Sequence, residues 1–229
     1  MLRGIRFGVG GCGRGGEDPG RPTRNAAKPR VISAEIEVFT DEEVRAILSA
    51  ATGDRLEALC TVAVGTGARE GELFALEAAD FDLNAGAVKI TKMLDQGEDG
   101  FKLQRPKSRS GLRTIGLPAF ALEAIGRHLV GRKPGPVFTS LSGTYLARSN
   151  FIRRDWAAQL EKAGVSYRKF HTLRHTHASR LLAAGVDPAE VSKRIGDLIE
   201  TVMRVYAHWI PTIGRDTAAR VDAIYGGKK

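Results

Sequence analysis

Apolar residues recur with helical spacing along most of the chain, and the first clear case begins at position 40. Thr40 and Glu43 have the spacing of a capping box, in which each side chain accepts a hydrogen bond from the other residue's backbone N–H. Val44, Ile47 and Leu48 then fall on one side of the helix that follows, as in a helix packed against a core. Ordered structure is therefore predicted to begin near position 38.

The same spacing predicts helices through most of the remaining sequence. Three short segments carry strand character instead and predict a small antiparallel sheet. The expected fold class is therefore mainly α with a small antiparallel β-sheet. The expected helices cover residues 55–64, 70–76, 118–130, 147–162, 173–184, 188–195, 199–207 and a last segment through 213–224, and the expected strands cover 87–91, 101–103 and 113–117.

The first 35 residues differ from the rest. Eight of the 27 glycines fall within the first twenty positions, and Pro19 and Pro22 interrupt any regular element there. Residues 1–35 are therefore predicted to be a disordered glycine-rich tail that ends in the remnant of a linker. Residues 36–229 are predicted to form a single domain.

The chain is strongly basic, with 35 Lys and Arg against 26 Asp and Glu, a formal net charge of +9 and a pI near 9.8. This charge favours a polyanionic partner, because Lys and Arg release counterions when they neutralise phosphates. Ribosomal-type and membrane-surface proteins have a similar basic charge, so the charge alone does not identify the partner. Two cysteines are too few for a disulfide framework or a zinc cluster, and no apolar stretch approaches the length of a membrane span. We expect a soluble cytoplasmic protein with no membrane partner.

Five residues suited to phosphoryl chemistry stand in this basic chain: Arg69, Lys107, His171, Arg174 and Tyr206. Cleavage at a phosphodiester builds charge on the non-bridging oxygens, and an arginine can hold that charge with two parallel hydrogen bonds. A histidine can act as general acid or base near neutral pH. A tyrosine with a pKa of about 10 needs nearby cations to act as a nucleophile. Taken singly, each residue also has an ordinary explanation, such as a surface ion pair, a solvated basic loop or a core tyrosine.

The strings around these residues resemble the tyrosine recombinases of the phage-integrase family, from about Phe39 to the C-terminus. They read Thr-Gly-Ala-Arg-Glu-Gly-Glu-Leu around Arg69, Pro-Lys-Ser around Lys107, His-Thr-Leu-Arg-His from His171, and Arg-Val-Tyr-Ala-His around Tyr206. The resemblance implies a tyrosine-recombinase catalytic domain over residues 36–229. It implies site-specific cleavage and rejoining of double-stranded DNA through a 3′-phosphotyrosyl intermediate, as in integration of a mobile element. It also implies self-association on DNA, and neither a metal nor a cofactor.

The resemblance assigns a role to each of the five residues. Arg69 and Arg174 hold the scissile phosphate, while His171 serves as general acid or base. Lys107 protonates the 5′-hydroxyl leaving group, and Tyr206 is the nucleophile.

Further residues near these strings receive supporting roles. By resemblance, Glu72 is a buried support for the arginines. The basic residues around the catalytic lysine are expected to bind DNA, with a solvated basic loop as the alternative; they are Lys102, Arg105, Arg109 and Arg113. His175 and His177 are expected to be structural, because no acidic or cysteine ligand of suitable spacing accompanies them for a metal site.

The chain departs from the family pattern at Asp197, where the family carries a histidine or sometimes a tryptophan. A carboxylate facing a phosphate adds repulsion where a hydrogen-bond donor belongs. The segment is also about one residue short, which could turn Tyr206 by about 100° on its helix. A separate N-terminal DNA-binding domain is not seen. An inactive DNA-binding remnant of an integrase therefore stays open as an alternative. A helix-rich transcriptional regulator is a second alternative, which the net charge of +9 permits.

Overall fold

The computed structural model describes residues 36–97, 100–106, 111–132, 134–211 and 217–226. The predicted tail over residues 1–35 lies outside the described residues and stays a prediction. Residues 212–216, just before the last helix, also lie outside the described residues. No helix in the described part of the chain is both long enough and apolar enough to cross a membrane.

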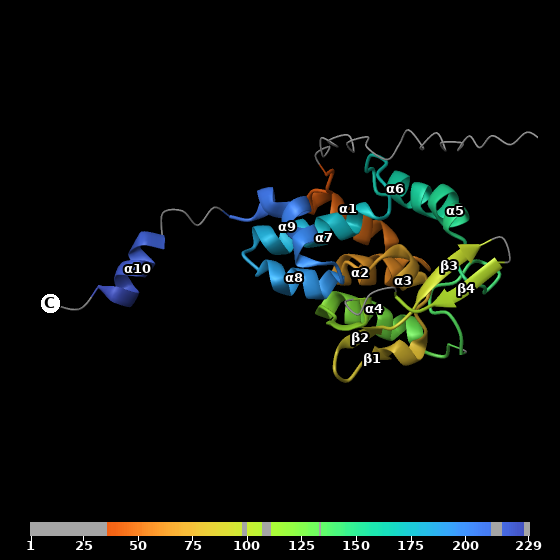
Figure 1. Ribbon diagram of the computed structural model, residues 1–229. Coiled ribbons are helices and arrows are strands. Elements are labelled where there is room, and N and C mark those ends of the chain that lie inside the picture. Colours follow the sequence, from red (N-terminus) through yellow and green to blue (C-terminus); the bar gives the residue numbers. More distant parts are fainter. Residues whose placement is uncertain (1–35, 98–99, 107–110, 133, 212–216, 227–229) are drawn as a thin grey trace, which may run out of the picture. The chain divides into compact units, whose positions relative to one another are not determined.

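The first helix, α1, spans Asp41–Ala51 and begins at the predicted capping box. Thr40 Oγ1 accepts from the Glu43 backbone N at 3.2 Å, and Glu43 Oε2 accepts from the Thr40 N at 2.8 Å. Its apolar side packs against α2, which spans Glu57–Thr66 and also contacts α4 and α7 (Figure 1). Nearly every residue of α2 is buried, so this helix forms the centre of the fold.

The glycine that ends α2 sets the direction of the chain into the candidate site. Gly67 has a φ of 62°, a left-handed conformation that a side chain disfavours. A Cβ there would also lie 2.6 Å from a ring carbon of His177. The tight turn lets Arg69 begin the next helix, α3, which spans Glu70–Phe74.

The strands form two separate antiparallel units instead of the one expected sheet. In the first, β2 (Ala87–Ile90) pairs with β1 (Phe81–Asp82) and with β5 (Arg113–Gly116). In the second, β3 (Met93–Gly97) pairs only with β4 (Gly100–Gln104). The sequence of β3 is Met-Leu-Asp-Gln-Gly, with no β-branched residue, so its pairing with β4 and not its own propensity makes it a strand.

The remaining helices follow the predicted positions closely. They are α4 (Ala119–Leu129), α5 (Arg148–Asn150) continued by a π-helical turn η3 (Phe151–Trp156) and α6 (Ala157–Lys162), α7 (Thr172–Ala183), α8 (Pro188–Ile195), α9 (Ile199–Tyr206) with a 3₁₀ turn η4 (Ala207–Trp209), and α10 (Thr217–Tyr225); a further short 3₁₀ turn, η1, covers Ala78–Asp80. The fold is thus mainly α-helical with small antiparallel sheets, as predicted.

Helix α7 connects two hydrophobic clusters. Leu173, at its first turn, belongs to the larger cluster, which contains the edge-to-face contacts of Trp156 with Phe39 and Phe170. Ala178 and Leu182, farther along α7, belong to a smaller cluster with residues of α8 and α9. The first turns of α7 therefore lie where the ends of several helices meet, and the candidate site is built there.

Candidate active site

Arg69 is held at the start of α3 by the acidic residue that follows it by three positions. The Arg69 backbone N donates to Glu72 Oε2 at 2.7 Å, and Arg69 Nη1 donates to Glu72 Oε1 at 3.0 Å. Its other terminal nitrogen, Nη2, donates to the carbonyl oxygen of Gly196 at 2.9 Å. The side chain is 37% exposed, so one edge of this guanidinium can still meet a ligand.

Arg174 lies on the first turns of α7 and is almost fully buried, with 3% of its side chain exposed. Its Nη1 donates to the carbonyl oxygens of Gly67, at 2.8 Å, and of Ile195, at 2.6 Å. These two carbonyls mark the ends of α2 and α8. Arg174 therefore ties two helix ends together and holds its second terminal nitrogen in a fixed direction.

Asp197 joins the two arginines. Arg174 Nη2 donates to Asp197 Oδ2 at 2.6 Å, and Arg69 Nη2 donates to the other oxygen, Oδ1. Burial alone would raise the pKa of this carboxyl, but the guanidiniums of Arg174 and Arg69 outweigh it and bring the pKa below its ordinary value. The side chain is thus an anion at neutral pH, and the two arginines form a binding site for an anion with two oxygens.

The turn after α8 directs this carboxylate into the cluster. Gly196 ends α8 with a φ of 71°, the left-handed conformation common after a helix. Ser192 Oγ then donates to the backbone carbonyl oxygen of Asp197 at 2.9 Å. The turn therefore brings Asp197 to the arginines instead of leaving it in solvent.

Glu72 has the supporting position that the resemblance implies. Its side chain is 3% exposed and accepts from Arg113 Nη1 at 3.0 Å and from Arg113 Nη2 at 2.8 Å, in addition to Arg69. Burial tends to raise the pKa of Glu72, but the hydrogen bonds and charge of Arg113 and Arg69 lower it overall. A buried carboxylate thus holds Arg69 in place.

The predicted DNA-binding residues separate into different environments. Arg113, with 7% of its side chain exposed, uses its guanidinium inside the protein, on Glu72 and on the Arg194 carbonyl oxygen. Arg113 shares the Glu72 carboxylate with Arg69, so it supports the cluster instead of facing solvent. Lys102 and Arg105, on and just after β4, are exposed.

Lys107 and Arg109 lie outside the described residues. The catalytic role of Lys107 and the DNA contact of Arg109 stay predictions from the sequence.

Tyr206, the last residue of α9, is 2% exposed, and its hydroxyl lies 2.7 Å from His175 Nδ1. Burial raises its pKa to about 12, although Arg174 and Arg69 act in the opposite direction. The helix therefore keeps Tyr206 at the arginine cluster.

His171 precedes α7, and its ring meets the His175 ring edge-on at 4.8 Å. Burial, followed by the charges of His175 and Arg174, lowers its pKa to about 4. His171 is thus neutral at pH 7. His171 and Arg69 both line a groove of about 1100 Å³. A large ligand in this groove can reach both side chains.

His175 is expected from the sequence to be structural, but its ring contacts the Tyr206 hydroxyl. The spacing contained a signal: His175 lies four positions after His171 and directly after Arg174, so the two histidines share one side of α7. The position of Tyr206 beside it depends on the packing of α9 and cannot be read from either string.

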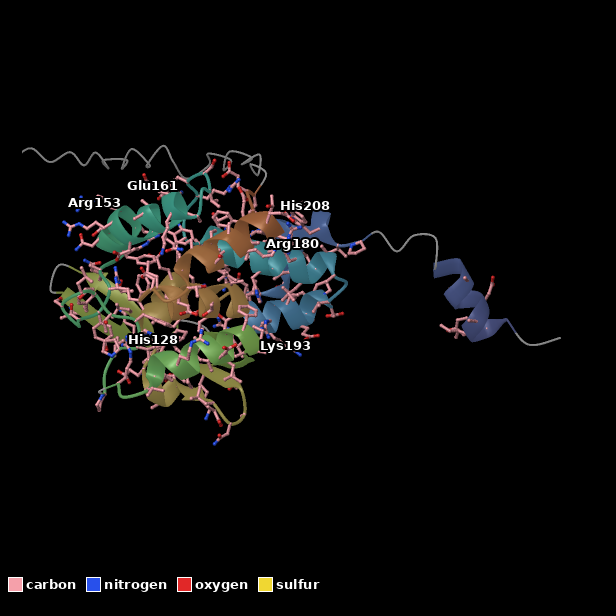
Figure 2. All side chains as sticks on the ribbon, turned by 180° about the vertical axis from the view of Figure 1, so that it is seen from behind. His128, Arg153, Glu161, Arg180, Lys193 and His208 are labelled. Atoms are coloured by element: carbon pink, nitrogen blue, oxygen red, sulfur yellow. The ribbon has the colours of Figure 1, made fainter. Side chains whose placement is uncertain are left out.

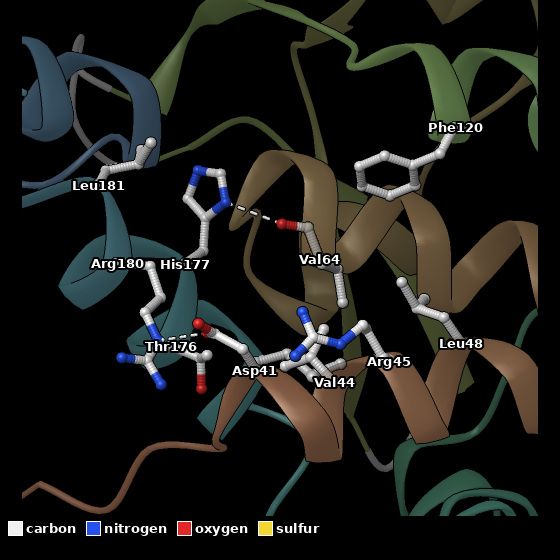
Figure 3. Close-up of a pocket in the computed structure, with 11 residues that line it drawn as sticks. Asp41, Val44, Arg45, Leu48, Val64, Phe120, Thr176, His177, Arg180 and Leu181 are labelled. Atoms are coloured by element: carbon white, nitrogen blue, oxygen red, sulfur yellow. Dashed lines mark hydrogen bonds and ion pairs between the residues drawn. The ribbon is translucent and has the colours of Figure 1, made fainter. Parts of the chain in front are cut away.

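His177 has the structural position that was expected. Its Nδ1 lies 2.8 Å from the Val64 carbonyl oxygen, and its Nε2 accepts from Arg194 Nε at 3.0 Å. Figure 3 shows it at the edge of a second, mostly apolar hollow of about 310 Å³, where Arg180 pairs with Asp41. The imidazole connects α7 to α2 and is not directed at Tyr206.

Comparison with known proteins identifies relatives over most of the chain. Residues 37–211 match the family described as the phage integrase family. The chain is 34% identical, over 205 residues, to a tyrosine recombinase XerC-like protein of Caldanaerobacter subterraneus subsp. tengcongensis, covering 79% of this chain and 52% of that protein. It is 29% identical, over 178 residues, to a putative prophage phiRv2 integrase of Mycobacterium tuberculosis, covering 75% and 47%. The chain therefore spans about half the length of these curated relatives.

Solved structures share the fold. The Tn1549 transposon integrase, in complex with circular intermediate DNA, superposes with a TM-score of 0.70 at 20% identity, over 84% of this chain and 68% of that one. The XerA recombinase superposes with a TM-score of 0.63 at 21% identity, over 91% and 70%. At this level of identity the likeness establishes the fold alone.

Proposed function

This chain belongs to the phage integrase family, and we propose that it cleaves and rejoins double-stranded DNA at specific sites through a covalent 3′-phosphotyrosyl intermediate. The observation that carries the proposal is the convergence of Arg69 and Arg174 on one two-oxygen anion, the Asp197 carboxylate. The scissile phosphate presents a similar pair of non-bridging oxygens. We place this activity in the cytoplasm.

In the proposed reaction the phosphate takes the place of the carboxylate between the two guanidiniums. Arg69 and Arg174 then hold the charge that grows on the non-bridging oxygens as the Tyr206 oxygen attacks phosphorus. The bond from phosphorus to the 5′-oxygen breaks, and Lys107 is the candidate donor of a proton to that oxygen. His171, which lines the groove beside Arg69, is the candidate acid or base on the phosphate side.

The proposal is tested with a nicked suicide duplex. After cleavage the short fragment that carries the 5′-hydroxyl diffuses away, so the strands cannot be rejoined and the covalent protein–DNA adduct accumulates. The wild-type chain should form an adduct that survives denaturation. Tyr206→Phe should bind the duplex and form none, because the ring still packs but the attacking oxygen is gone. Tyr145→Phe, at a half-buried tyrosine whose ring lies 5.9 Å from that of Phe101, is the matched control and should behave as wild type.

Metal independence belongs to the same proposal and uses the same assay. Adduct formation should be unchanged when a chelator is added, because the two arginines supply the charge that a metal ion would otherwise supply. A chelator that abolishes the adduct would contradict this part of the proposal.

A second candidate function is that of a DNA-binding integrase remnant without activity. The observation that favours it is again the Asp197 carboxylate, which occupies both arginines. Binding of the suicide duplex by the wild type with no adduct at any pH would support this candidate over the first.

We further propose that protomers associate on DNA through the C-terminal segment. Helix α10 carries Val221, Ile224 and Tyr225 with 47%, 71% and 80% of their surface exposed. Apolar residues so exposed are suited to a partner surface.

A further inference from the structure

The hydroxyl of Tyr206 has one hydrogen-bonding partner among the described residues, and it is His175. The Oη–Nδ1 distance is 2.7 Å, and the two ring centroids lie 5.8 Å apart with planes inclined at 49°. The two residues come from different helices, α7 and α9, that pack together in the smaller hydrophobic cluster. The contact therefore depends on the tertiary fold.

The protonation state of His175 decides what this contact can do. Burial and the nearby charge of Arg174 lower the pKa of His175 below its ordinary value, although Asp197 opposes them. At pH 7 the ring is therefore neutral, with one nitrogen able to accept. If that nitrogen is Nδ1, its lone pair faces the hydroxyl proton of Tyr206.

Among the described residues, none of the other groups near the hydroxyl forms a hydrogen bond with it. Arg69 and Arg174 contribute charge there, but guanidiniums are donors only. Both oxygens of Asp197 already accept from these arginines. His171 packs against the His175 ring.

We infer that His175 takes the proton of the Tyr206 hydroxyl as its oxygen attacks phosphorus, and returns it when the strands are rejoined. The inference rests on the proposed function. In cleavage the Oη–H bond breaks, its proton moves to His175 Nδ1, and an Oη–P bond forms. The P–O5′ bond breaks, and its electron pair stays on the 5′-oxygen, which receives a separate proton from the general acid. In rejoining, the 5′-hydroxyl returns its proton to that general acid as its oxygen attacks phosphorus. The Oη–P bond then breaks, and Tyr206 Oη takes back the proton held by His175.

The test compares two suicide duplexes, one natural and one with sulfur in place of the bridging 5′-oxygen. A thiolate leaves without a proton, because its conjugate acid is far stronger than an alcohol (pKa about 8.5 for a cysteine thiol). His175→Gln keeps a hydrogen bond to the hydroxyl but cannot take its proton. It should slow adduct formation by roughly 100-fold or more on both duplexes. His175→Ala should show the same loss and recover part of it with added imidazole.

Control variants separate this role from others. Lys107→Ala should be slow only on the natural duplex, since the sulfur leaving group needs no acid. His128→Gln changes a histidine on α4 (Figure 2), whose ring nitrogen lies 3.0 Å from the Val137 carbonyl oxygen, and should leave the rate unchanged. Circular dichroism and duplex affinity show whether each variant is folded.

Three outcomes would overturn the inference. One is a wild-type rate for His175→Gln, which would mean that the histidine only positions Tyr206 and takes no proton. Another is recovery of His175→Gln on the sulfur duplex, which would place its role at the leaving group. The third outcome is measured by nitrogen-15 NMR of labelled histidine, which does not require an active protein. We expect the neutral His175 ring to carry its proton on Nε2 at pH 7. A proton on Nδ1 would make the ring a donor to Tyr206.

The NMR result also separates this inference from the proposed function. If the wild type forms no adduct on either duplex, the proposed function fails. The tautomer of His175 then still decides whether the ring is placed to accept a proton.

Discussion

Replacing Asp197 with asparagine should make the protein form the DNA adduct faster and unfold at a lower temperature. The carboxylate accepts from Arg69 on one oxygen and from Arg174 on the other. Both guanidiniums must release it before they can bind a scissile phosphate. An asparagine of nearly the same shape removes the charge and offers an amide N–H at the same place.

The gain in rate can be estimated from a single hydrogen bond. A donor missing from an oxyanion site costs about 2.7–4 kcal/mol, or a factor of roughly 100 to 1,000 in rate. The Arg69 side chain is 37% exposed and Asp197 is 22% exposed, so water screens part of the interaction. We therefore expect Asp197→Asn to accelerate adduct formation at saturating DNA by about 100-fold, the lower end of that range.

The loss of stability has the same origin. Arg174, at 3% exposure, would remain charged beside Arg69 with no anion between them. Removing one partner of a buried ion pair costs about 3–5 kcal/mol, and the partial exposure of Asp197 favours the lower end. At about 2–4 °C per kcal/mol for a domain of this size, Tm should fall on the order of 10 °C.

The sign of the pH dependence follows from the pKa of Asp197, which Arg174 and Arg69 lower against the effect of burial. A carboxyl with a lowered pKa stabilises the fold above its unfolded pKa of about 3.9, and this contribution is lost as the pH falls through the folded value. The difference in Tm between wild type and Asp197→Asn should therefore be full at pH 7 and shrink below about pH 4.

The assay pairs the rate of trapping on the suicide duplex with thermal melting from pH 7 to pH 3.5. Asp187→Asn is the control: Asp187 caps α8 by accepting from the Ala189 N at 2.7 Å, and asparagine caps a helix about as well. It should change neither the rate nor Tm. A rate for Asp197→Asn at or below that of the wild type, or an unchanged Tm, would refute the reasoning.

Three further predictions concern the surrounding residues. Glu72→Gln should destabilise the domain by about 3–5 kcal/mol, measured by urea unfolding, because it leaves Arg113 buried without its carboxylate; a loss well under 1 kcal/mol would contradict this. Duplex affinity should fall steeply with salt, and Lys102→Gln or Arg105→Gln should each reduce the salt slope by about one; a slope unchanged in both would exclude them as phosphate contacts. Truncation after Ile210 should abolish DNA-dependent assembly in sedimentation while leaving single-site binding intact, and unaltered assembly would contradict the proposed role of the C-terminal segment.

The helices could be predicted from sequence because their signals are local. Thr40 with Glu43, and the glycines that end α2 and α8, fix helix ends within a few residues, and the apolar spacing fixes the buried side. The sheet was predicted less well. Strand β3 lacks a propensity signal, and its pairing with β4 and its contact with α3 are properties of the folded chain.

The candidate site was predicted as a set of residues but not as a network. The strings identified Arg69, Arg174 and Tyr206, which the structure brings together. They gave no indication that Asp197 would bridge both arginines, or that His175 would meet the tyrosine hydroxyl. Those contacts join α3, α7, α9 and the turn after α8, and side chains on separate helices leave no shared pattern in the sequence.

The bonding of Arg174 shows why such a site can exchange a carboxylate for a phosphate. Its Nη1 donates to two backbone carbonyl oxygens, at the ends of α2 and α8. These two hydrogen bonds do not depend on which anion is bound. Only Nη2 holds Asp197. The guanidinium therefore needs no reorientation when the anion changes, which is the condition under which a fixed charge stabilises a transition state most strongly. The same carbonyls make Arg174 part of the fold, so Arg174→Ala would mix a loss of stability with a loss of phosphate binding. Asp197→Asn leaves both carbonyl bonds of Arg174 in place. It should raise the rate while it lowers Tm, and these opposite signs separate the two effects.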